Sequence, residues 1–484
     1  MATLALVLPV ALCVATGLLA AVARATGLWR WVGVISSVGI LGCALLLSAA
    51  VLAGQHPTAL GGLLAADALS AFMLVVIGCV GLVASWAGFG AGRDWTYGSL
   101  VGLFLGAMSL AVLTDNLGVL LVAIEATTVA TAFLVGHEGS RRSLEAAWKY
   151  VILGSAGIAL AFLGVVLLYT ATLAAEQPTL SWAALASGQV TGLDPSLMRL
   201  AGGLMVLGFA TKVGLAPMHS WLPDAHSQAP APVSGLMSGV LLSVAFYAIL
   251  RVQAVVDEVV GPQFLRGILI AAGLASLAVA GLLLIRQRDL KRMLAYSSVE
   301  HMGIVALAAA IGGPVAITAA LLHVLGHGLV KSSLFVVSGR ILVAEGTASI
   351  PAIRRLASRR PDLASPLIVG LVALLGLPPF SLFFTEVAIA FAGVEAGLGW
   401  VVAVAVLLLL VVFAAIVRLG AHMTLGVTDP RVEPETSDGR RARAGFGRQL
   451  PIVAAFGAAI VVGFAVGPLP ALLDAAGQLL TVRR

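Results

Sequence analysis

An ionisable side chain in the middle of an apolar segment is the first feature of this sequence that could do chemistry. Lys212 lies a dozen residues into an apolar run that starts at Leu200. A lysine at the centre of a bilayer costs about 2.5 to 3.5 kcal/mol, so such residues normally face a protein interior or a wet cavity and serve a function. Twelve helical residues span about 18 Å, which is deep for the alternative, a lysine that snorkels to the interface.

The run is interrupted directly after this lysine, at Gly214, Pro217 and Pro223. Proline frees backbone carbonyls one turn earlier, and a membrane protein tolerates free carbonyls only where water, ions or protein groups satisfy them. A buried lysine beside a broken helix therefore predicts an ion path, and an ordinary proline kink is the alternative.

Glu125 is the acidic counterpart of this lysine. It lies near the centre of another apolar segment, Asn116–Val135. A lone carboxyl group there would stay neutral, whereas one next to a lysine could ionise. We predict that Glu125 pairs with Lys212. A structural hydrogen-bond clamp between two helices is the alternative.

A third apolar segment contains His323, His327 and Lys331. Spacings of four residues place all three on one helix face, about 6 Å apart per step. Histidine titrates near neutrality and can pass a proton either way, so this row predicts a proton relay. Zinc binding is the rival, but no carboxylate or cysteine lies nearby in the sequence and a lysine takes the place of a third ligand. We expect no metal here. Histidines that only pack are the remaining alternative.

A second interrupted segment, Val372–Glu386, repeats the G-L-x-P pattern of the first break. Interrupted spans in corresponding positions are typical of transporters built from inverted repeats, with the sites at the breaks. Glu386 follows this second break and is therefore a candidate site residue. The match is short, and coincidence is the alternative.

Glu300 and His301 lie a turn or two inside a further apolar segment that begins near Leu294. They are either an entry for ions from the cytoplasmic side or interfacial residues that bond the basic cluster at 286–292. The sequence does not separate these two interpretations.

The elements that position these residues must be membrane helices. The chain has 484 residues, of which 60% are hydrophobic and 10% charged, and its mean hydropathy is +1.07. Apolar runs of about 20 residues recur from end to end, so we predict an all-α polytopic membrane protein with about 14 spans. The predicted spans begin near Ala2, Trp31, Ala68, Gly98, Leu117, Tyr150, Leu197, Pro230, Phe264, Leu294, Pro314, Ala364, Gly397 and Pro451.

Nothing in the sequence indicates a redox cofactor. Cys13, Cys43 and Cys79 stand singly in apolar runs, so neither an iron-sulfur cluster nor a zinc site has its usual ligands. The glycine-rich stretch at 88–92 lacks a strand and is only a loop. We expect no cofactor and no metal, and the net charge of +6 indicates membrane topology rather than nucleic-acid binding.

Basic residues are distributed unequally among the predicted loops. Twenty-one Lys and Arg residues fall after odd-numbered spans and three after even-numbered ones. The positive-inside rule then places the odd loops in the cytoplasm and both termini on the outer side. The polar segment Val427–Gln449 is accordingly predicted to be a cytoplasmic loop.

Three motifs together carry a resemblance to a known family. They are residues 219–234 (HSWLPDAHSQAPAPVS), 288–303 (RDLKRMLAYSSVEHMG) and 321–335 (LLHVLGHGLVKSSLF). The chain resembles, from about Leu100 to Ile416, the antiporter-like subunits of respiratory complex I, membrane-bound hydrogenases and Mrp-type antiporters. The stretch YSSVEHMG is most similar to component F of the hydrogenase-four and formate hydrogenlyase type.

The resemblance implies 14 helices with two inverted five-helix repeats. On this division residues 1–97 form an N-terminal three-helix segment, 98–255 the first repeat, 256–424 the second repeat, and 425–484 a cytoplasmic loop with a last helix. It also implies an ion pathway whose members are Glu125, Lys212, His323, His327, Lys331 and Glu386.

One position departs from the family pattern. Many relatives carry Lys or His where this chain has Ser243. We expect a water chain held by Ser243, with Ser238 about a turn away, to link the two halves, because a hydroxyl group both donates and accepts hydrogen bonds. Glu300 and His301 complete the proposed relay. A serine that only packs a helix crossing is the alternative.

Three functions fit these observations. The first is a proton-translocating or sodium-translocating subunit of a redox complex in the cell membrane, partnered by other membrane subunits and, through them, by peripheral redox subunits. The second is a secondary cation/proton antiporter without redox coupling. The third, a scaffold that only anchors partners, is disfavoured because so many buried ionisable groups are costly.

Overall fold

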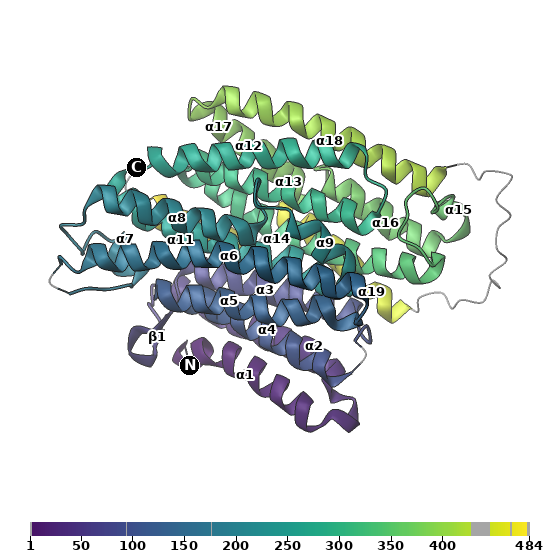
Figure 1. Ribbon diagram of the computed structural model, residues 1–484, viewed down its shortest axis with the longest axis horizontal. Coiled ribbons are helices and arrows are strands. Elements are labelled where there is room, and N and C mark those ends of the chain that lie inside the picture. Colours follow the sequence, from purple (N-terminus) through teal and green to yellow (C-terminus); the bar gives the residue numbers. More distant parts are fainter. Residues whose placement is uncertain (1, 93, 176, 427–445, 465–466, 482–484) are drawn as a thin grey trace.

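The computed structural model describes residues 2–92, 94–175, 177–426, 446–464 and 467–481. They form a bundle of long helices, with one hairpin of two-residue strands, so the predicted all-α membrane class is confirmed (Figure 1). Twelve helices among these residues are long and apolar enough to cross a membrane. Residues 427–445, which make up most of the predicted cytoplasmic loop at 427–449, lie outside the described residues.

The chain before the predicted repeats contains three long helices. They are α1 (Ala2–Val22), α2 (Val32–Leu52) and α3 (Ala68–Ala87), accompanied by the short helices η1 (Arg24–Thr26), η2 (Leu28–Trp31) and η3 (Leu60–Gly62) and by strands β1 (Thr58–Ala59) and β2 (Leu64–Ala65). The two strands pair antiparallel.

The region predicted as the first repeat contains α4 (Trp95–Leu113), α5 (Leu117–Val135), η4 (Gly136–Glu138), α6 (Arg141–Thr172), α7 (Trp182–Ala186), α8 (Pro195–Val213), α9 (Trp221–Gln228), α10 (Ala231–Leu236), the π-helical turn η5 (Met237–Leu241) and α11 (Leu242–Val260). The following region contains α12 (Gln263–Ile285), α13 (Leu290–Ile311), α14 (Gly313–Glu345), α15 (Leu356–Arg359), α16 (Pro361–Leu374), α17 (Ser381–Glu395) and α18 (Gly399–Leu425), and the chain ends with α19 (Phe446–Gly463) and α20 (Leu469–Thr481).

Two predicted spans are pairs of shorter helices. The span expected near Ala364 is α16 followed by α17, and the one expected near Pro451 is α19 followed by α20. Six of the long helices begin where a short polar side chain accepts a hydrogen bond from the first turn, which fixes their start despite the largely apolar sequence. These capping residues are Asp67, Asp94, Asn116, Ser140, Asp194 and Asp289.

Helix α14 is the central element of the bundle. It packs against α3, α10, α13, α16, α17, α19 and α20 (Figure 1). It also packs against η5, where Gly239 and Gly328 face each other. A Cβ atom built on Gly239 would lie 3.0 Å from the Cα atom of Gly328. Small residues allow this close backbone approach, as is usual where membrane helices cross.

A buried ion pair joins α3 to α11 near one end of the bundle. Arg251, 1% exposed, donates to the Oδ1 atom of Asp67 at 2.7 Å, and its guanidinium lies 3.6 Å from the Trp182 ring centroid. Burial alone would raise the pKa of Asp67, but the charge of Arg251 and hydrogen bonds from Arg251 and Ser70 hold it below its ordinary value. Removing one partner of a buried pair costs about 3 to 5 kcal/mol, so this contact fixes the packing of α11.

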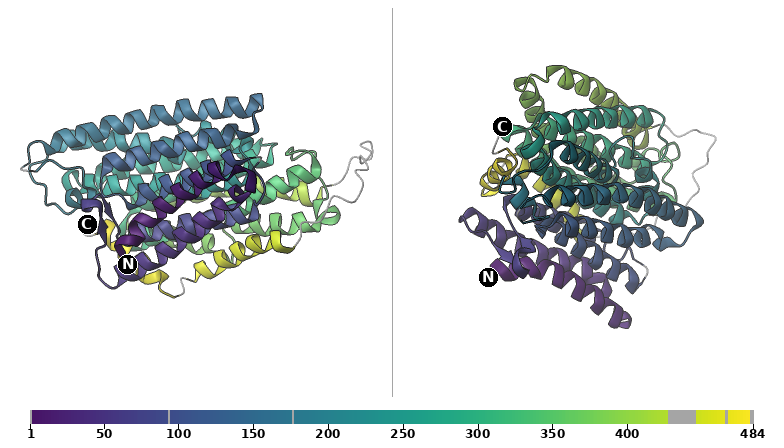
Figure 2. Two further views of the ribbon diagram at one scale, coloured as in Figure 1. Left: turned by 90° about the horizontal axis from the view of Figure 1, so that it is seen from below. Right: turned by 60° about the vertical axis from the view of Figure 1, so that its left-hand side comes forward.

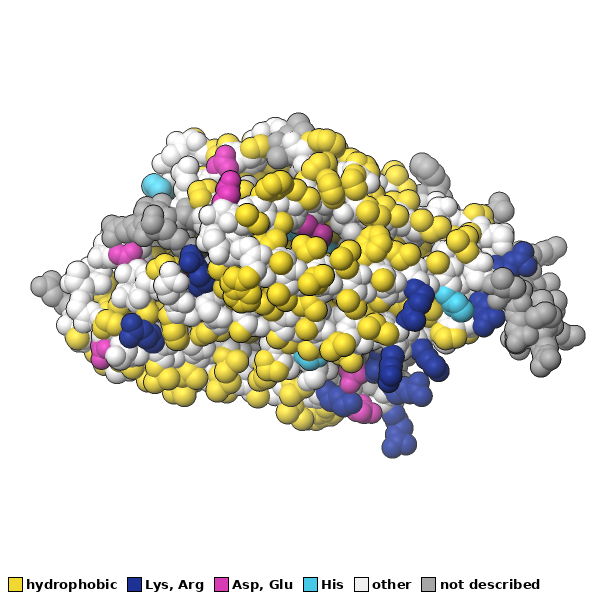
Figure 3. All heavy atoms as spheres, turned by 90° about the horizontal axis from the view of Figure 1, so that it is seen from above, with side chains coloured by type: hydrophobic (Ala, Val, Ile, Leu, Met, Phe, Trp, Pro, Cys, Tyr) yellow, Lys and Arg dark blue, Asp and Glu magenta, His cyan; other side chains and the backbone are white. Residues whose placement is uncertain are grey.

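Both termini lie at the same end of the bundle, and α15 lies at the other (Figures 1 and 2). Lys and Arg side chains gather at the α15 end, whereas hydrophobic side chains cover the length of the bundle between the ends (Figure 3). This arrangement is the one expected of an even number of membrane crossings with the basic loops on one side.

Candidate functional site

The first helix break lies directly after Lys212. Helix α8 begins at Pro195, so Lys212 is in its last turn, deeper along the helix than the sequence run suggested. Gly214, with φ of 77°, ends the helix. The polar backbone groups of the break have protein partners: the Trp221 indole donates to the Thr211 carbonyl at 2.7 Å, and the Ala216 amide donates to Ser276 Oγ at 2.9 Å. The break is therefore stable in an apolar interior.

Lys212 is fully buried, which excludes a snorkelling side chain. Its Nζ atom donates to the hydroxyl group of Thr128 on α5 and lies 5.0 Å from the centroid of the Tyr150 ring on α6. The ammonium occupies space left by Gly154, where a Cβ atom would lie only 2.6 Å from Nζ. Three helices thus enclose the amine.

The predicted partner, Glu125, lies beside this amine. Its Oε2 atom is 3.9 Å from Lys212 Nζ and accepts a 2.9 Å hydrogen bond from Thr128. Its Oε1 atom accepts a 2.6 Å hydrogen bond from Ser155 on α6. The carboxylate and the amine are therefore joined both by charge and through the Thr128 hydroxyl, which bonds to each of them. A hydroxyl between two ionisable groups can pass a proton by donating to one and accepting from the other.

The second break separates α16 from α17 and brings Glu386 inward. Gly376 has φ of 58°, and a Cβ atom at this position would lie 2.5 Å from Glu386 Oε2, so only glycine fits both the backbone and the space. Glu386 and Glu300 line one cavity of about 450 Å³ between α13, α17 and α18. Both breaks therefore place an ionisable group against a glycine that leaves room for it.

Three histidine rings meet beyond this break. His301 Nδ1 lies 3.0 Å from His323 Nε2, and the centroids of the His301 and His327 rings are 5.0 Å apart. His323 Nδ1 lies 2.9 Å from Thr385 Oγ1, whose hydroxyl donates to the Leu382 carbonyl. When the Thr385 hydroxyl donates to Leu382 and both rings are neutral, His323 donates through Nδ1 and accepts at Nε2, and His301 donates through Nδ1. The hydrogen bonds therefore have one direction in this arrangement.

Lys331 ends the row on α14 and faces α13. Its Nζ atom donates to Ser297 Oγ at 2.5 Å and to the Leu294 carbonyl. His327, one turn earlier, has no hydrogen-bond partner on either ring nitrogen among the described residues. The predicted shared face of His323, His327 and Lys331 is observed, and α13 supplies the groups opposite it.

Glu300 and His301 lie far from the membrane interface. Helix α13 begins at Leu290, so both residues are about three turns inside it, and they are 5% and 0% exposed. The interpretation as interfacial residues bonding the cluster at 286–292 is wrong, since His301 contacts the α14 row instead. No carboxylate lies near the histidines in the sequence, but the fold brings Glu386 within 4.8 Å of His323.

The direct hydrogen bond of Ser243 stays within its own helix. The Ser243 hydroxyl donates to the Gly239 carbonyl at 3.1 Å. Ser238, in the π-helical turn η5, instead lies 2.8 Å from Ser298 on α13. Ser238, which the sequence suggested only as a companion of Ser243, therefore makes a direct hydroxyl-to-hydroxyl contact between the two halves.

His226 is a candidate that the sequence analysis did not select. It is fully buried on α9, its ring stacks on Phe335 of α14 at 5.0 Å, and neither ring nitrogen has a hydrogen-bond partner among the described residues. Phe335 also lies against Lys331. His226 thus connects the segment after the first break to the α14 row, and its place within the motif at 219–234 was the available signal.

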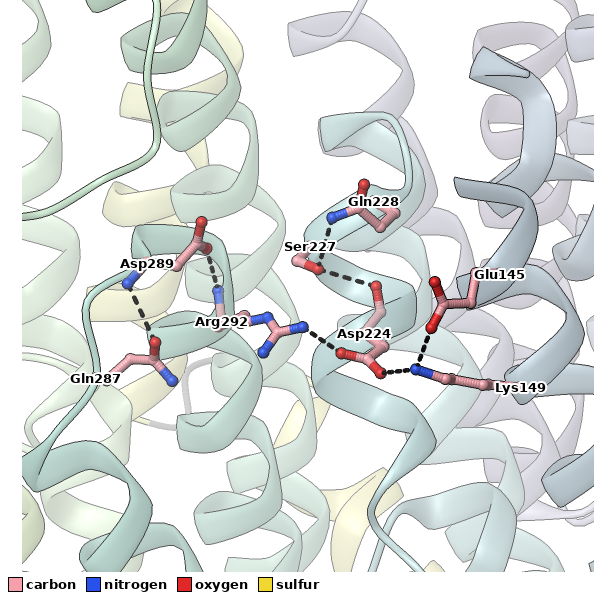
Figure 4. Close-up of polar contacts among 8 residues, drawn as sticks. All are labelled: Glu145, Lys149, Asp224, Ser227, Gln228, Gln287, Asp289 and Arg292. Carbon is pink, nitrogen blue, oxygen red and sulfur yellow. Dashed lines mark hydrogen bonds and ion pairs between the residues drawn. The ribbon is translucent and has the colours of Figure 1, made fainter. Parts of the chain in front are cut away.

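A polar network ties α9 to both halves of the chain (Figure 4). Asp224 on α9 accepts from Lys149 of α6 at 3.3 Å and pairs with Arg292 of α13. Lys149 also pairs with Glu145 at 2.7 Å. The short helix that follows the first break is therefore held from two sides.

Comparisons with known proteins agree with this architecture. The family model described as NADH:quinone oxidoreductase/Mrp antiporter, TM, matches residues 114–412. A hydrogenase-4 component F homolog of Methylacidiphilum infernorum is 42% identical over 295 residues, which are 60% of this chain and 61% of that protein. NADH-quinone oxidoreductase subunit N of Myxococcus xanthus is 30% identical over 85% of both chains.

Solved structures show the same fold over nearly the whole chain. A chain of the archaeal membrane-bound sulfane sulfur reductase gives a TM-score of 0.86 at 25% identity, covering 99% of this chain and 97% of that one. A chain of the Mrp complex from Dietzia sp. DQ12-45-1b gives 0.85 at 22% identity, with the same coverage. Given the matched family model and these relatives, this chain belongs to the family of membrane subunits shared by NADH:quinone oxidoreductases and Mrp antiporters.

Proposed function

We propose that this chain is a proton-translocating or sodium-translocating, antiporter-like subunit of a multisubunit membrane redox complex, of membrane-bound hydrogenase or complex I type. The observation that carries the proposal is the buried amine of Lys212, joined to Glu125 directly after a helix break. A fully buried lysine paired with a half-buried glutamate at a broken membrane helix is costly and is typical of ion pathways.

The proposed pathway has two halves. The first contains Glu125 and Lys212, and the second contains Lys331, His327, His301, His323 and Glu386, with Glu300 beside them. His226 and the Ser238–Ser298 contact connect the halves. Proton movement in one half changes charge next to the other, and coupling in a low-dielectric interior is strong.

The proposed setting is a cell membrane with both termini outside, because the basic end of the bundle then faces the cytoplasm. Residues 98–255 and 256–424 are the proposed inverted repeats, each with one break. Peripheral redox subunits are the proposed source of energy, with no redox cofactor held by this chain.

A secondary antiporter without redox coupling is the second candidate, supported by the fold shared with the Mrp complex. Co-purification of a nickel-iron or flavin-containing partner supports the first candidate, and purely membranous partners support the second.

The first prediction tests the role of the buried amine. Lys212→Met should abolish ion translocation, measured as acidification or sodium uptake in vesicles, while the complex still assembles. Arg199→Met is the matched control, because Arg199 is an exposed cation on the same helix. Normal translocation by the Lys212 variant would refute the proposed pathway.

A further inference from the structure

Two histidines and one glutamate from three separate helices converge in the second half of the bundle. His301 of α13, His323 of α14 and Glu386 of α17 each offer a ligand atom, and these atoms lie within 4.8 Å of one another. The group was invisible in the sequence, where the three residues are separated by 22 and 63 positions. Two imidazole nitrogens and a carboxylate oxygen are a ligand set that zinc-type ions use in proteins.

The geometry is close to that of a bound ion. In a tetrahedral site with bonds of about 2.0 to 2.2 Å, ligand atoms stand about 3.3 to 3.6 Å apart. His301 Nδ1 and His323 Nε2 already lie 3.0 Å apart. Closure therefore needs the two imidazole nitrogens to separate slightly and the carboxylate to move by about 1 Å, which rotations of the three side chains can supply.

The surroundings hold the ligands in place. Thr385 accepts the Nδ1 proton of His323, and such a contact orients a metal-bound histidine. If the His301 ring proton moves from Nδ1 to Nε2, no proton is lost from the pair, and Nδ1 of His301 and Nε2 of His323 each carry a free lone pair. His301 Nε2 has no hydrogen-bond partner among the described residues, so nothing there opposes the exchange.

The charges near the cluster also accommodate a dication. Glu386 and Glu300 line the adjoining cavity of about 450 Å³, so two carboxylates can offset the added charge. Lys331 is the opposing cation, and its Nζ atom is already bound to Ser297 and the Leu294 carbonyl. His327 completes the cluster as a third imidazole.

A second cavity supplies a route to the site. It measures about 340 Å³ and extends from Thr385 to Asp474 of α20. Helix α20 ends near the C-terminus, at the end of the bundle where both termini lie (Figure 2). An acidic residue beside a cavity that reaches the partner of His323 would attract cations from that side.

We propose that His301, His323 and Glu386 bind one divalent transition-metal ion of zinc type, and that a bound ion blocks proton transfer through the second half. The ion takes the lone pairs that would otherwise carry protons. The proposal that these residues bind a metal ion is argued from geometry alone. The proposal that the ion blocks proton transfer rests on the proposed function.

Binding is tested on the purified full-length chain with zinc chloride in equilibrium dialysis, followed by metal analysis. Wild type and His56→Gln, which changes an exposed loop histidine, should bind one equivalent with equal affinity. His301→Gln and Glu386→Gln should each weaken binding at least tenfold, and Thr385→Val should weaken it about tenfold while leaving all ligands present. Equal binding by wild type and the ligand variants, or no binding by wild type, would overturn the site.

A second experiment, with cobalt, tests the site even if one of the ligand variants above fails to fold. His323→Cys retains three ligands, and its complex with cobalt chloride should show a near-ultraviolet thiolate-to-cobalt band that wild type lacks. The three native cysteines lie on α1, α2 and α3, so they give the same background in both proteins. Absence of the band in a folded variant contradicts the site.

Inhibition is measured separately, as zinc-dependent loss of translocation in vesicles of each orientation. Zinc applied from the side of the termini should inhibit, and Asp474→Asn should slow the onset. Zinc binding without inhibition would leave the site standing and refute the blocking role. Because dialysis needs no translocation, failure of the proposed function leaves the binding result intact.

Discussion

Lys212 can lie inside the bundle because residue 154 has no side chain. A Cβ atom on Gly154 would stand 2.6 Å from Lys212 Nζ, closer than real atoms approach. The same arrangement occurs at Gly376, where the absence of a side chain leaves room for the Glu386 carboxyl group. At the residue scale, the ionisable groups are therefore positioned by glycines on neighbouring segments as much as by their own helices.

The second prediction follows from this contact. Gly154→Ala should displace the amine from Thr128 and reduce translocation at least tenfold, although alanine favours helix formation by about 0.5 to 1 kcal/mol over glycine. Translocation and thermal stability are measured together. Gly267→Ala, on the exposed side of α12 with open space around it, is the matched control and should leave translocation unchanged. Unchanged translocation in the Gly154 variant would show that the amine does not need its present position.

At the element scale, the two helix breaks and the π-helical turn place polar groups in the interior that a straight helix would not. A straight helix satisfies its own backbone, whereas the break after α8 exposes polar groups that Trp221 and Ser276 then satisfy. The turn η5 carries Ser238 toward α13, and π-helical turns occur frequently at functional sites. Irregular backbone in this bundle accordingly lies next to ionisable or hydroxyl groups.

The third prediction compares the two serines of this segment. Ser238→Ala removes the 2.8 Å contact with Ser298 and should lower translocation about tenfold, whereas Ser243→Ala loses only a bond within its own helix and should change translocation less than twofold. Translocation is measured in vesicles for both variants, and assembly of each variant is checked by co-purification. A larger loss in the Ser243 variant would restore Ser243 as the link between the halves.

At the scale of the whole molecule, charge separates the two ends of the bundle. Basic side chains gather at the end that holds α15, and both termini lie at the opposite end (Figures 1 and 3). Loop charge sets the orientation of membrane proteins, so the α15 end is expected in the cytoplasm.

The fourth prediction tests this orientation by cysteine labelling in intact cells. Gln55→Cys, exposed in the loop after α2, should react with a membrane-impermeant maleimide from outside. Ser358→Cys, exposed in α15, should react only after the membrane is opened. The native cysteines are buried or half-buried, and the unmodified chain is the control. Labelling of both positions from the same side would contradict the topology.

The sequence alone determined the helical membrane class, both breaks and the identity of most ionisable groups. These features are local: apolar length fixes a span, glycine and proline fix a break, and a charge inside an apolar run is visible without neighbours. The pairing of Glu125 with Lys212 was also predictable, because opposite charges that both lie inside apolar segments stabilise each other.

Apart from the pair of Glu125 and Lys212, only the tertiary structure decided which groups meet across helices. His301, His323 and Glu386 lie on three different helices, and the spacing of residues within one helix does not show which faces of the three pack together. His226 and Ser238 were missed or undervalued because their roles depend on Phe335 and Ser298, on helices that follow much later in the chain. In a chain that is hydrophobic on all sides, close packing of small residues rather than the pattern of polarity selects the helix contacts, and that selection exists only in the folded protein.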